Sequence, residues 1–215
     1  MPLSSYTVIF TQRRVAFMLL LGFSSGLPLA LTTGTLQAWA TVDGLDIKTI
    51  SFLTLVGSAY TLKFLWAPLM DRFVPPLLGR RRGWMLVTQL LLVAGIALMG
   101  TQSPKASIMA LALIAVVVAF CSASQDIAFD AYRTDVLHKE ERGAGAAVSV
   151  LGYRLAMLVS GGLALVLADS FLGWQATYWL MAALMFIGIV ATWFAPARPN
   201  TRRKPFTLFR TLAPS

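Results

Sequence analysis

The sequence contains few of the residues from which catalytic and metal-binding sites are commonly built. Its 215 residues include one cysteine, Cys121, and one histidine, His138. A single cysteine excludes an intrachain disulfide and a thiolate metal cluster within the chain. His138 is followed by a lysine and two glutamates, so we interpret it as a loop residue rather than a metal ligand. Because no nucleotide-binding glycine loop, zinc motif or nucleophile triad is recognisable, we expect no metal, no cofactor and no enzymatic activity.

Charge is scarce as well, and it is unevenly distributed. Asp and Glu number 9 against 18 Lys and Arg, and charged residues make up 13% of a chain that is 57% hydrophobic. Hydrophobic runs cover about residues 15–39, 50–70, 84–101, 107–129, 144–168 and 174–195. Each is close to the ~20 residues that cross a bilayer as a helix. The sequence therefore predicts an all-α integral membrane protein, a bundle of six transmembrane helices in contact with lipid.

The basic residues predict the topology of this bundle, and their placement argues against nucleic-acid binding. They gather at alternate ends of successive runs, at Arg13 and Arg14, at Arg72 and Arg80 to Arg82, at Arg133 to Arg142, and from Arg198 onward. Lys and Arg are retained on the cytoplasmic side of membranes, so both termini are expected in the cytoplasm. We divide the chain into a cytoplasmic N-terminus (1–14), a six-helix transmembrane domain (15–197) and a basic cytoplasmic tail (198–215). Trp39 and Trp174 are expected in an interfacial aromatic belt.

The first hydrophobic run is unusually polar near its outer end. Pro28 removes a backbone hydrogen bond shortly after Gly26, which predicts a hinge there. Thr33 and Gln37 share a face with Gly26 at helical spacing. Either this helix is kinked and packs tightly on a neighbour, or it lines a polar cavity and Thr33 and Gln37 contact substrate.

Small residues predict a close-packing face on each of two helices. Gly22 and Gly26 lie on one face of the first run, and Gly145, Ser149 and Gly152 lie on one face of the fifth. Such faces let helix backbones approach closely in lipid. Packing is one interpretation, and sliding between helices during a conformational change is the other.

Charged residues inside hydrophobic runs are costly, which makes them candidates for function. Arg154 lies near the middle of the fifth run and is a candidate to bind an anionic substrate. Lys63, in the second run, either extends to the membrane surface or contributes to the same site. At the inner end of the fourth run, Asp126, Asp130 and Arg133 share a helical face. They are interpreted as an ion-pair network or as a proton-coupling and gating group.

A charged loop follows the second run. Asp71 and Arg72 end that run, and Gly79 precedes Arg80, Arg81 and Arg82. This pattern resembles the cytoplasmic motif Gly-x-x-x-Asp-Arg-x-Gly-Arg-Arg of the major facilitator superfamily. Ala67 replaces the first glycine of that motif, and extra residues separate Arg72 from Gly79. The resemblance implies that Asp71, Arg72 and the three following arginines act in gating.

Longer segments resemble one branch of that superfamily, the AmpG-type muropeptide permeases of Gram-negative bacteria. They are residues 22–31, 63–72, 79–84, 120–130, 141–147, 149–154 and 159–165. The resemblance implies a multi-pass carrier of the bacterial inner membrane, driven by the proton gradient. It would import anhydro-muropeptides (N-acetylglucosaminyl-anhydro-N-acetylmuramyl peptides) for cell-wall recycling, and so influence β-lactamase induction.

Carriers of this superfamily consist of two six-helix halves with the substrate site between them. The sequence predicts only the N-terminal half, so we expect a C-terminal six-helix half to complete it in cis or in trans. Three alternatives stay open: another cargo such as an acyl-coenzyme A, drug efflux, or a truncated chain without transport of its own.

Overall fold

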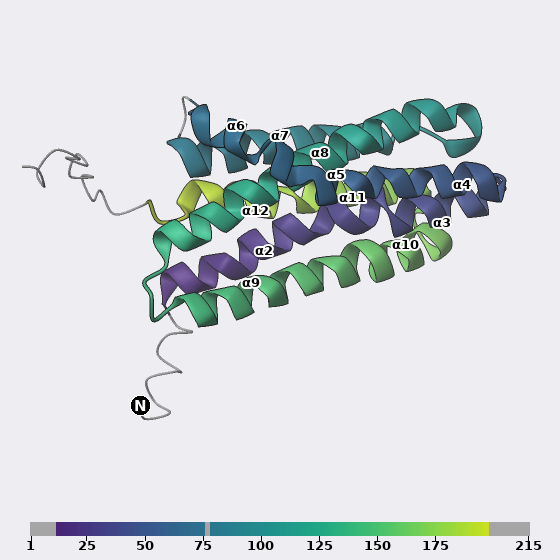
Figure 1. Ribbon diagram of the computed structural model, residues 1–215. Coiled ribbons are helices and arrows are strands. Elements are labelled where there is room, and N and C mark those ends of the chain that lie inside the picture. Colours follow the sequence, from purple (N-terminus) through teal and green to yellow (C-terminus); the bar gives the residue numbers. More distant parts are fainter. Residues whose placement is uncertain (1–11, 76–77, 198–215) are drawn as a thin grey trace, which may run out of the picture.

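The computed structural model describes residues 12–75 and 78–197, and every regular element within them is helical (Figure 1). In chain order the elements are α2 (Arg13–Thr32), α3 (Gly34–Val42), α4 (Ile47–Leu53), η1 (Thr54–Gly57), α5 (Ser58–Leu62), η2 (Lys63–Leu65), α6 (Ala67–Arg72), α7 (Arg80–Met99), α8 (Pro104–Val136), α9 (Arg142–Met157), η3 (Leu158–Leu163), α10 (Ala164–Ser170), α11 (Gly173–Leu184) and α12 (Phe186–Phe194). They form one elongated bundle, which confirms the all-α prediction.

Five stretches of helix in the described residues are long and apolar enough to cross a membrane. They are Arg13–Val42, Arg80–Met99, Pro104–Val136, Arg142–Ser170 and Gly173–Phe194. These stretches correspond to the first, third, fourth, fifth and sixth hydrophobic runs. The chain is therefore a multi-pass membrane protein, as predicted.

The second predicted span, residues 50–70, is not one continuous helix. It is a succession of short segments, α4, η1, α5, η2 and α6, that extends along the bundle (Figure 1). Its serine and threonine hydroxyls donate to carbonyls three or four residues earlier, as Ser51, Thr54 and Ser58 do. Such bonds compete with the helical ladder and bend helices. The second run is therefore not a continuous helix, and its crossing of the membrane as a sixth span stays a prediction.

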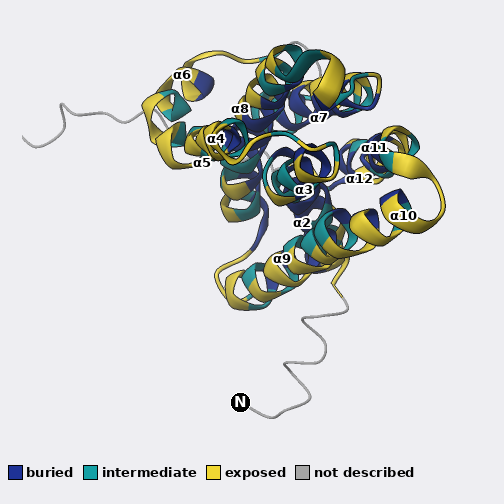
Figure 2. Cartoon of the chain, turned by 90° about the vertical axis from the view of Figure 1, so that its right-hand side faces the viewer, coloured by how far each residue is buried: buried dark blue, intermediate teal, exposed yellow. Residues whose placement is uncertain are grey.

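The first span lies at the centre of the bundle (Figure 2). Its core side chains, such as Val15, Met18 and Leu27, are fully buried. Along α2 it packs closely on α9, because small residues remove side chains from between the two backbones. An added Cβ on Gly22 would lie 2.3 Å from the carbonyl oxygen of Ser149, and one on Gly152 would lie 2.2 Å from that of Leu19. The close packing predicted for these two faces is confirmed.

The fifth span changes its winding halfway along. Leu158–Leu163 forms a π-helix that includes Gly161 and Gly162. Within it, the carbonyl oxygen of Ser160 accepts a 2.7 Å hydrogen bond from the hydroxyl of Thr35 on α3. The first and fifth spans are thus joined by a polar bond as well as by packing.

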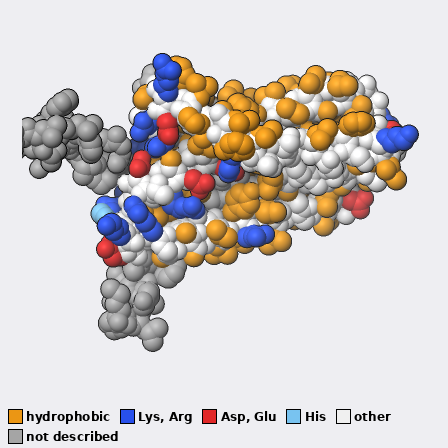
Figure 3. Space-filling model, in the orientation of Figure 1, with side chains coloured by type: hydrophobic (Ala, Val, Ile, Leu, Met, Phe, Trp, Pro, Cys, Tyr) orange, Lys and Arg blue, Asp and Glu red, His pale blue; other side chains and the backbone are white. Residues whose placement is uncertain are grey.

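Charge separates the two ends of the bundle. Blue side chains gather at the end where α2 begins and α12 ends (Figure 3). We call this the basic end; it carries Arg13, Arg80 to Arg82, Arg133 and Arg142. Because α2 begins and α12 ends at the basic end, the arrangement agrees with an even number of membrane crossings. The assignment of the basic end to the cytoplasm stays a prediction. The predicted tail, 198–215, lies outside the described residues, as does most of the predicted N-terminal segment.

The aromatic belt prediction was wrong for Trp39. Its ring is buried, with 3% of the residue exposed. It stacks on Trp174 with a centroid distance of 5.8 Å and packs on Tyr178. Packing against other spans replaces the lipid contact that the sequence suggested.

Candidate functional site

A polar cavity of about 260 Å³ opens between the first, second, fourth and fifth spans. Its wall is formed by Ser25, Lys63, Asp126, Phe129, Asp130, Arg133, Ser149, Val150 and Tyr153. Four of the charged residues selected from the sequence, Lys63, Asp126, Asp130 and Arg133, are thereby brought to one site. They come from η2 and from α8, which are far apart in the chain.

Lys63 and Asp126 form an ion pair in this cavity. The Lys63 Nζ lies 3.7 Å from Oδ2 of Asp126, and Oδ1 of the same carboxylate accepts a hydrogen bond from the Ser25 hydroxyl. The Asp126 side chain is 13% exposed and that of Lys63 is 36% exposed. Lys63 therefore points to a carboxylate, and the alternative in which it extends to the membrane surface is not the one observed. A charged pair inside a membrane segment is a device that proteins use for ion or proton movement.

Arg133 belongs to a second group, one to two turns nearer the basic end. Its Nη2 lies 3.0 Å from Oδ1 of Asp130, and its Nη1 donates to the Ser149 hydroxyl at 2.8 Å. The guanidinium also lies over the Phe129 ring, 5.9 Å from its centroid. The single network expected for Asp126, Asp130 and Arg133 is thus divided, with Asp126 paired to Lys63 and Asp130 paired to Arg133.

Three predicted substrate contacts lie outside this cavity wall. Arg154 is exposed on α9, next to the cavity residue Tyr153, and its guanidinium makes no hydrogen bond or ion pair within the described part of the chain. The Thr33 hydroxyl donates to the carbonyl of Leu29 at 2.7 Å, and Gln37 is half-buried on α3. Their roles in substrate binding stay predictions.

The predicted hinge residues lie within regular helix. Helix α2 continues through Gly26 and Pro28 to Thr32, and the backbone leaves helical geometry only at Thr33 (φ −116°, ψ −100°). Gly26 itself packs on Tyr153, whose carbonyl oxygen would lie 2.6 Å from an added Cβ. The interruption thus falls five residues after Pro28, where Thr32 and Thr33 both bond back to the preceding turn.

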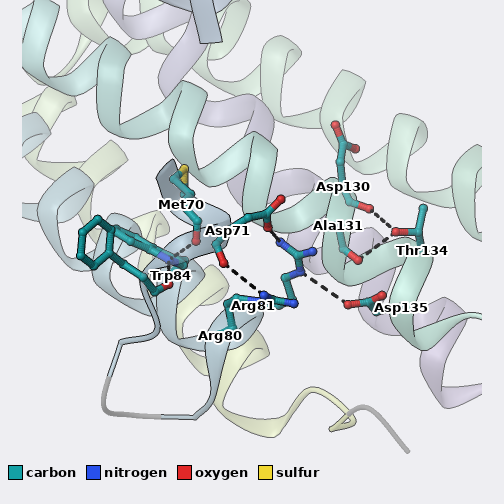
Figure 4. A network of polar contacts seen from close by, with 10 residues as sticks. Met70, Asp71, Arg80, Arg81, Trp84, Asp130, Ala131, Thr134 and Asp135 are labelled. Atoms are coloured by element: carbon teal, nitrogen blue, oxygen red, sulfur yellow. Dashed lines mark hydrogen bonds and ion pairs between the residues drawn. The ribbon is translucent and has the colours of Figure 1, made fainter. Parts of the chain in front are cut away.

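At the basic end, Arg81 connects three helical segments (Figure 4). Its Nη1 contacts the carboxylate of Asp71 at the end of α6, and its Nε lies 3.5 Å from Oδ2 of Asp135 near the end of α8. Arg80 supports the same contact by donating to the Asp71 carbonyl at 3.1 Å. Asp135 was missed by the sequence reasoning, and its proximity to Arg133 at the end of a hydrophobic run was the available signal.

The remaining arginines of the motif act differently. Arg82 donates to the carbonyl of Thr192 at 3.1 Å and to that of Trp193, which satisfies the last turn of α12. Arg72 is exposed, and its guanidinium makes no hydrogen bond or ion pair with the described residues. The turn before α7 depends on Gly79, whose φ of +76° is a conformation that glycine adopts at little cost.

A buried polar layer lies beside the Lys63–Asp126 pair. Ser24 accepts a 3.1 Å hydrogen bond from the Gln125 amide, and Thr192 donates to the Gln89 carbonyl at 2.9 Å. All four side chains are at most 1% exposed. Because Ser24 and Gln125 directly precede Ser25 and Asp126, their hydrogen bond joins the first and fourth spans next to the site. The sequence analysis did not identify this polar layer, because isolated uncharged polar residues in apolar runs do not show which of them will meet inside the bundle.

The family model described as Major Facilitator Superfamily matches residues 16–211. The chain belongs to the major facilitator superfamily. The residues that resemble the charged motif, Asp71 and Arg80 to Arg82, lie at the end of α6 and the start of α7, where Arg81 contacts Asp71. The family prediction is confirmed.

Individual relatives agree with this assignment to the major facilitator superfamily. The chain is 64% identical over 205 residues to the anhydromuropeptide permease of Escherichia coli K12, an alignment that covers 95% of this chain and 42% of the relative. It is 41% identical over 192 residues to an uncharacterised protein of Haemophilus influenzae, with coverages of 89% and 45%. The putative transporter AmpG 4 of Rickettsia felis is 33% identical over 188 residues, with coverages of 86% and 45%.

The chain spans less than half the length of these relatives. Two of them are named as a permease or transporter, which agrees with the prediction that this superfamily member is not an enzyme.

Proposed function

We propose that the chain is the N-terminal half of a proton-coupled permease that imports anhydro-muropeptides across the bacterial inner membrane for cell-wall recycling. The observation that carries this proposal is the 64% identity to the E. coli anhydromuropeptide permease. Through its imported cargo the same carrier would influence β-lactamase induction.

The cavity and the spans that surround it supply groups suited to such a cargo and to proton coupling. Muropeptides bear several carboxylates, so Arg154 and Lys63 are the proposed electrostatic contacts, with Gln37 and Thr33 as polar ones. Asp126 is the proposed proton carrier. Protonation of its carboxylate would remove the charge that holds Lys63, freeing the ammonium group for substrate. The proton gradient thereby supplies the energy, and no cofactor is required.

The basic end is the proposed gate. Alternating access requires one end of the bundle to close while the other opens. Asp71, Arg81 and Asp135 join the second, third and fourth spans, and Arg133, which pairs with Asp130 on its own helix, joins the fourth span to the fifth through Ser149. Breaking these contacts would let the spans separate at this end. Gly26 and Pro28 are the proposed hinge, and Arg72, Arg80 and Arg82 support the gate.

A second bundle is the proposed partner. The cavity lies on one side of this bundle, and many apolar side chains of the second and fifth spans next to it are exposed, among them Leu62, Leu65, Val150 and Leu151. In two-half carriers the site lies at the interface of the halves. We therefore place a C-terminal six-helix half, in cis or in trans, over this cavity.

The test is uptake of labelled anhydro-muropeptide by cells that lack their own permease. The complete protein should restore uptake, and residues 1–215 alone should not. Asp126→Asn should flatten the dependence of uptake on external pH, and Arg154→Ala should reduce uptake more than tenfold at equal amounts of membrane protein. Lys105→Ala, at an exposed position in the first turn of α8, is the matched control. Normal uptake by Arg154→Ala would remove that residue from the site, and no uptake of this cargo by the complete protein would refute the proposed function.

A further inference from the structure

An apolar groove of about 670 Å³ runs along the surface of the bundle between the first and sixth spans. Phe17 and Leu20 of α2 lie on one side of it, and side chains from Ala183 to Phe194 of α11 and α12 lie on the other. Among the described residues that line this groove, Arg13 alone is charged. The groove thus combines a long hydrocarbon surface with one positive charge.

This groove and the polar cavity lie on different sides of the first span. The described wall of the cavity comes from the first, second, fourth and fifth spans and shares no residue with the groove. Seen along the bundle, α11 and α12 lie to one side of α2, whereas α4 and α5 lie to the other (Figure 2). A second half placed over the cavity therefore leaves the groove open to lipid.

The charge lies at the end of the groove that belongs to the basic end of the bundle. The Arg13 guanidinium lies 5.5 Å from the centroid of the Phe17 ring, and its Nη2 donates to the carbonyl of Phe194 at 3.5 Å. No carboxylate neutralises it, since none of the ion pairs among the described residues includes Arg13. These contacts hold a positive charge at the mouth of the groove.

A second arginine adds to the positive charge at this mouth. Arg82 donates to the carbonyls of Thr192 and Trp193, directly before the carbonyl that Arg13 contacts. The end of a helix is equivalent to only about half a negative charge, which two guanidinium groups exceed. Positive charge therefore remains in excess there, and an anionic group would complement it.

The length of the groove matches one leaflet of a bilayer. Ala183 and Phe194 lie eleven residues apart in the sixth span, which is about 16 Å along a helix at 1.5 Å per residue. Half of a hydrocarbon core of about 30 Å is about 15 Å. An acyl chain whose headgroup lies at Arg13 would therefore follow the groove toward the middle of the membrane.

We propose that this groove binds an anionic phospholipid of the leaflet at the basic end. One acyl chain lies between the first and sixth spans, and the headgroup phosphate pairs with Arg13. Basic pockets between transmembrane helices bind anionic headgroups in this way, and the planar guanidinium matches the geometry of phosphate. Only the position of the second half is taken from the proposed function; the lipid site is independent of the cargo.

The test is photolabelling of the complete protein in vesicles. The vesicles consist of phosphatidylcholine with a minor share of phosphatidylglycerol, and one of the two lipids carries a diazirine on its acyl chain. Mass spectrometry of the digested protein then locates the adducts. Phosphatidylglycerol should label residues 13–20 and 183–194 more strongly than phosphatidylcholine does. Arg13→Gln should lower this labelling by phosphatidylglycerol about fivefold, because a basic residue near an anionic surface contributes about that factor.

Two matched controls accompany the variants. Arg14→Gln removes the same charge at the next position, but Arg14 contacts His138 and does not line the groove, so labelling should change little. Val190→Trp should fill the groove and lower labelling by phosphatidylglycerol. Leu90→Trp, on α7 outside the groove, should not; Leu90 is 52% exposed and Val190 is 54% exposed.

Three results would overturn the site: equal labelling by the two lipids, equal losses in Arg13→Gln and Arg14→Gln, or no adduct in these segments. The last is expected if the second half or another copy of the chain covers the groove. Because the measurement needs no cargo, its outcome is distinguishable from that of the uptake test. The expected labelling in a protein that does not import anhydro-muropeptide would support the lipid site and refute the proposed function alone.

Discussion

At the scale of single residues, the polar groups of this chain work in pairs contributed by different spans. Lys63 and Asp126 lie far apart in sequence and meet in the cavity, where Ser25 completes the coordination of the carboxylate. Neither charge is fully buried, so water still reaches the pair. Removing one member of the pair leaves the other charge without a partner in a medium of low dielectric constant. This costs more free energy of folding than replacing both members by apolar side chains.

This asymmetry gives a prediction for stability. Lys63→Met should lower the stability of the folded protein by about 1–3 kcal/mol, less than for a fully buried pair because Lys63 is 36% exposed. Asp126→Leu combined with Lys63→Met should recover part of that loss. The measurement is the thermal unfolding midpoint in detergent. Equal losses in the single and double variants would mean that the pair contributes nothing specific.

At the scale of helices, two kinds of contact hold the elements together: backbone contact in the core and a shared arginine at the basic end. The first is illustrated by α2 and α9, whose backbones touch at Gly22 and Gly152. Because the atoms facing these glycines are backbone atoms, they cannot move aside as a flexible side chain would.

Gly152→Ala should therefore separate α2 from α9. The added Cβ would lie 2.2 Å from the Leu19 carbonyl oxygen and 2.9 Å from the Phe23 nitrogen. A misfit of this kind costs about 1–3 kcal/mol or more. The yield of folded protein and its unfolding midpoint should both fall. Gly162→Ala, in the same span but with no atom within 4 Å of its added Cβ, should leave both unchanged. Equal effects of the two substitutions would contradict this packing.

The arginine contact predicts a local effect on α6. Arg81 uses two separate nitrogens for Asp71 and Asp135, which a lysine cannot reproduce. Both Arg81→Lys and Arg81→Gln should raise amide hydrogen exchange in residues 67–75. Arg72→Gln removes an arginine that makes no hydrogen bond or ion pair with the described residues; it is the control and should change exchange little. Unaltered exchange in the Arg81 variants would show that the end of α6 is held by other contacts, such as the Trp84 bonds to Met70 and Phe73.

At the scale of the whole molecule, the distribution of charge should determine how the bundle sits in the membrane. The ends of α2 and α12 are joined at the basic end, where Arg13 donates to the Phe194 carbonyl at 3.5 Å. The opposite end contains the loops at residues 43–46 and 100–103. If the basic end is cytoplasmic, these loops face outward.

Cysteine labelling can test this orientation, because Cys121 is the one cysteine of the chain and is buried. In a Cys121→Ala background, Gln102→Cys should react with a membrane-impermeant maleimide in intact cells. Lys139→Cys should react only after the membrane is opened. The reverse pattern would mean that the positive-inside assignment is wrong for this protein.

The sequence by itself determined the class and family of the protein. Hydrophobic runs of bilayer length can hardly be satisfied other than by helices, because backbone groups in lipid must bond within their own segment. Small residues at helical spacing likewise marked close-packing faces on the first and fifth spans, at Gly22 and Gly26 and at Ser149 and Gly152, although only the structure shows that these faces meet each other. The acidic and basic motif after the second span and the segments that match one permease branch identified the superfamily.

Tertiary structure alone decided which charges meet. Periodicity places Asp126, Asp130 and Arg133 on one face, but it cannot show that η2 brings Lys63 to Asp126 while Ser149 and Asp130 hold Arg133. Nor can it show that Asp135 shares Arg81 with Asp71, or that Trp39 stacks inside the bundle. The reason is physical: a side chain bonds with whatever neighbouring span lies within a few ångströms. Local sequence fixes the face on which a residue lies, and only the packing of the spans fixes what that face meets.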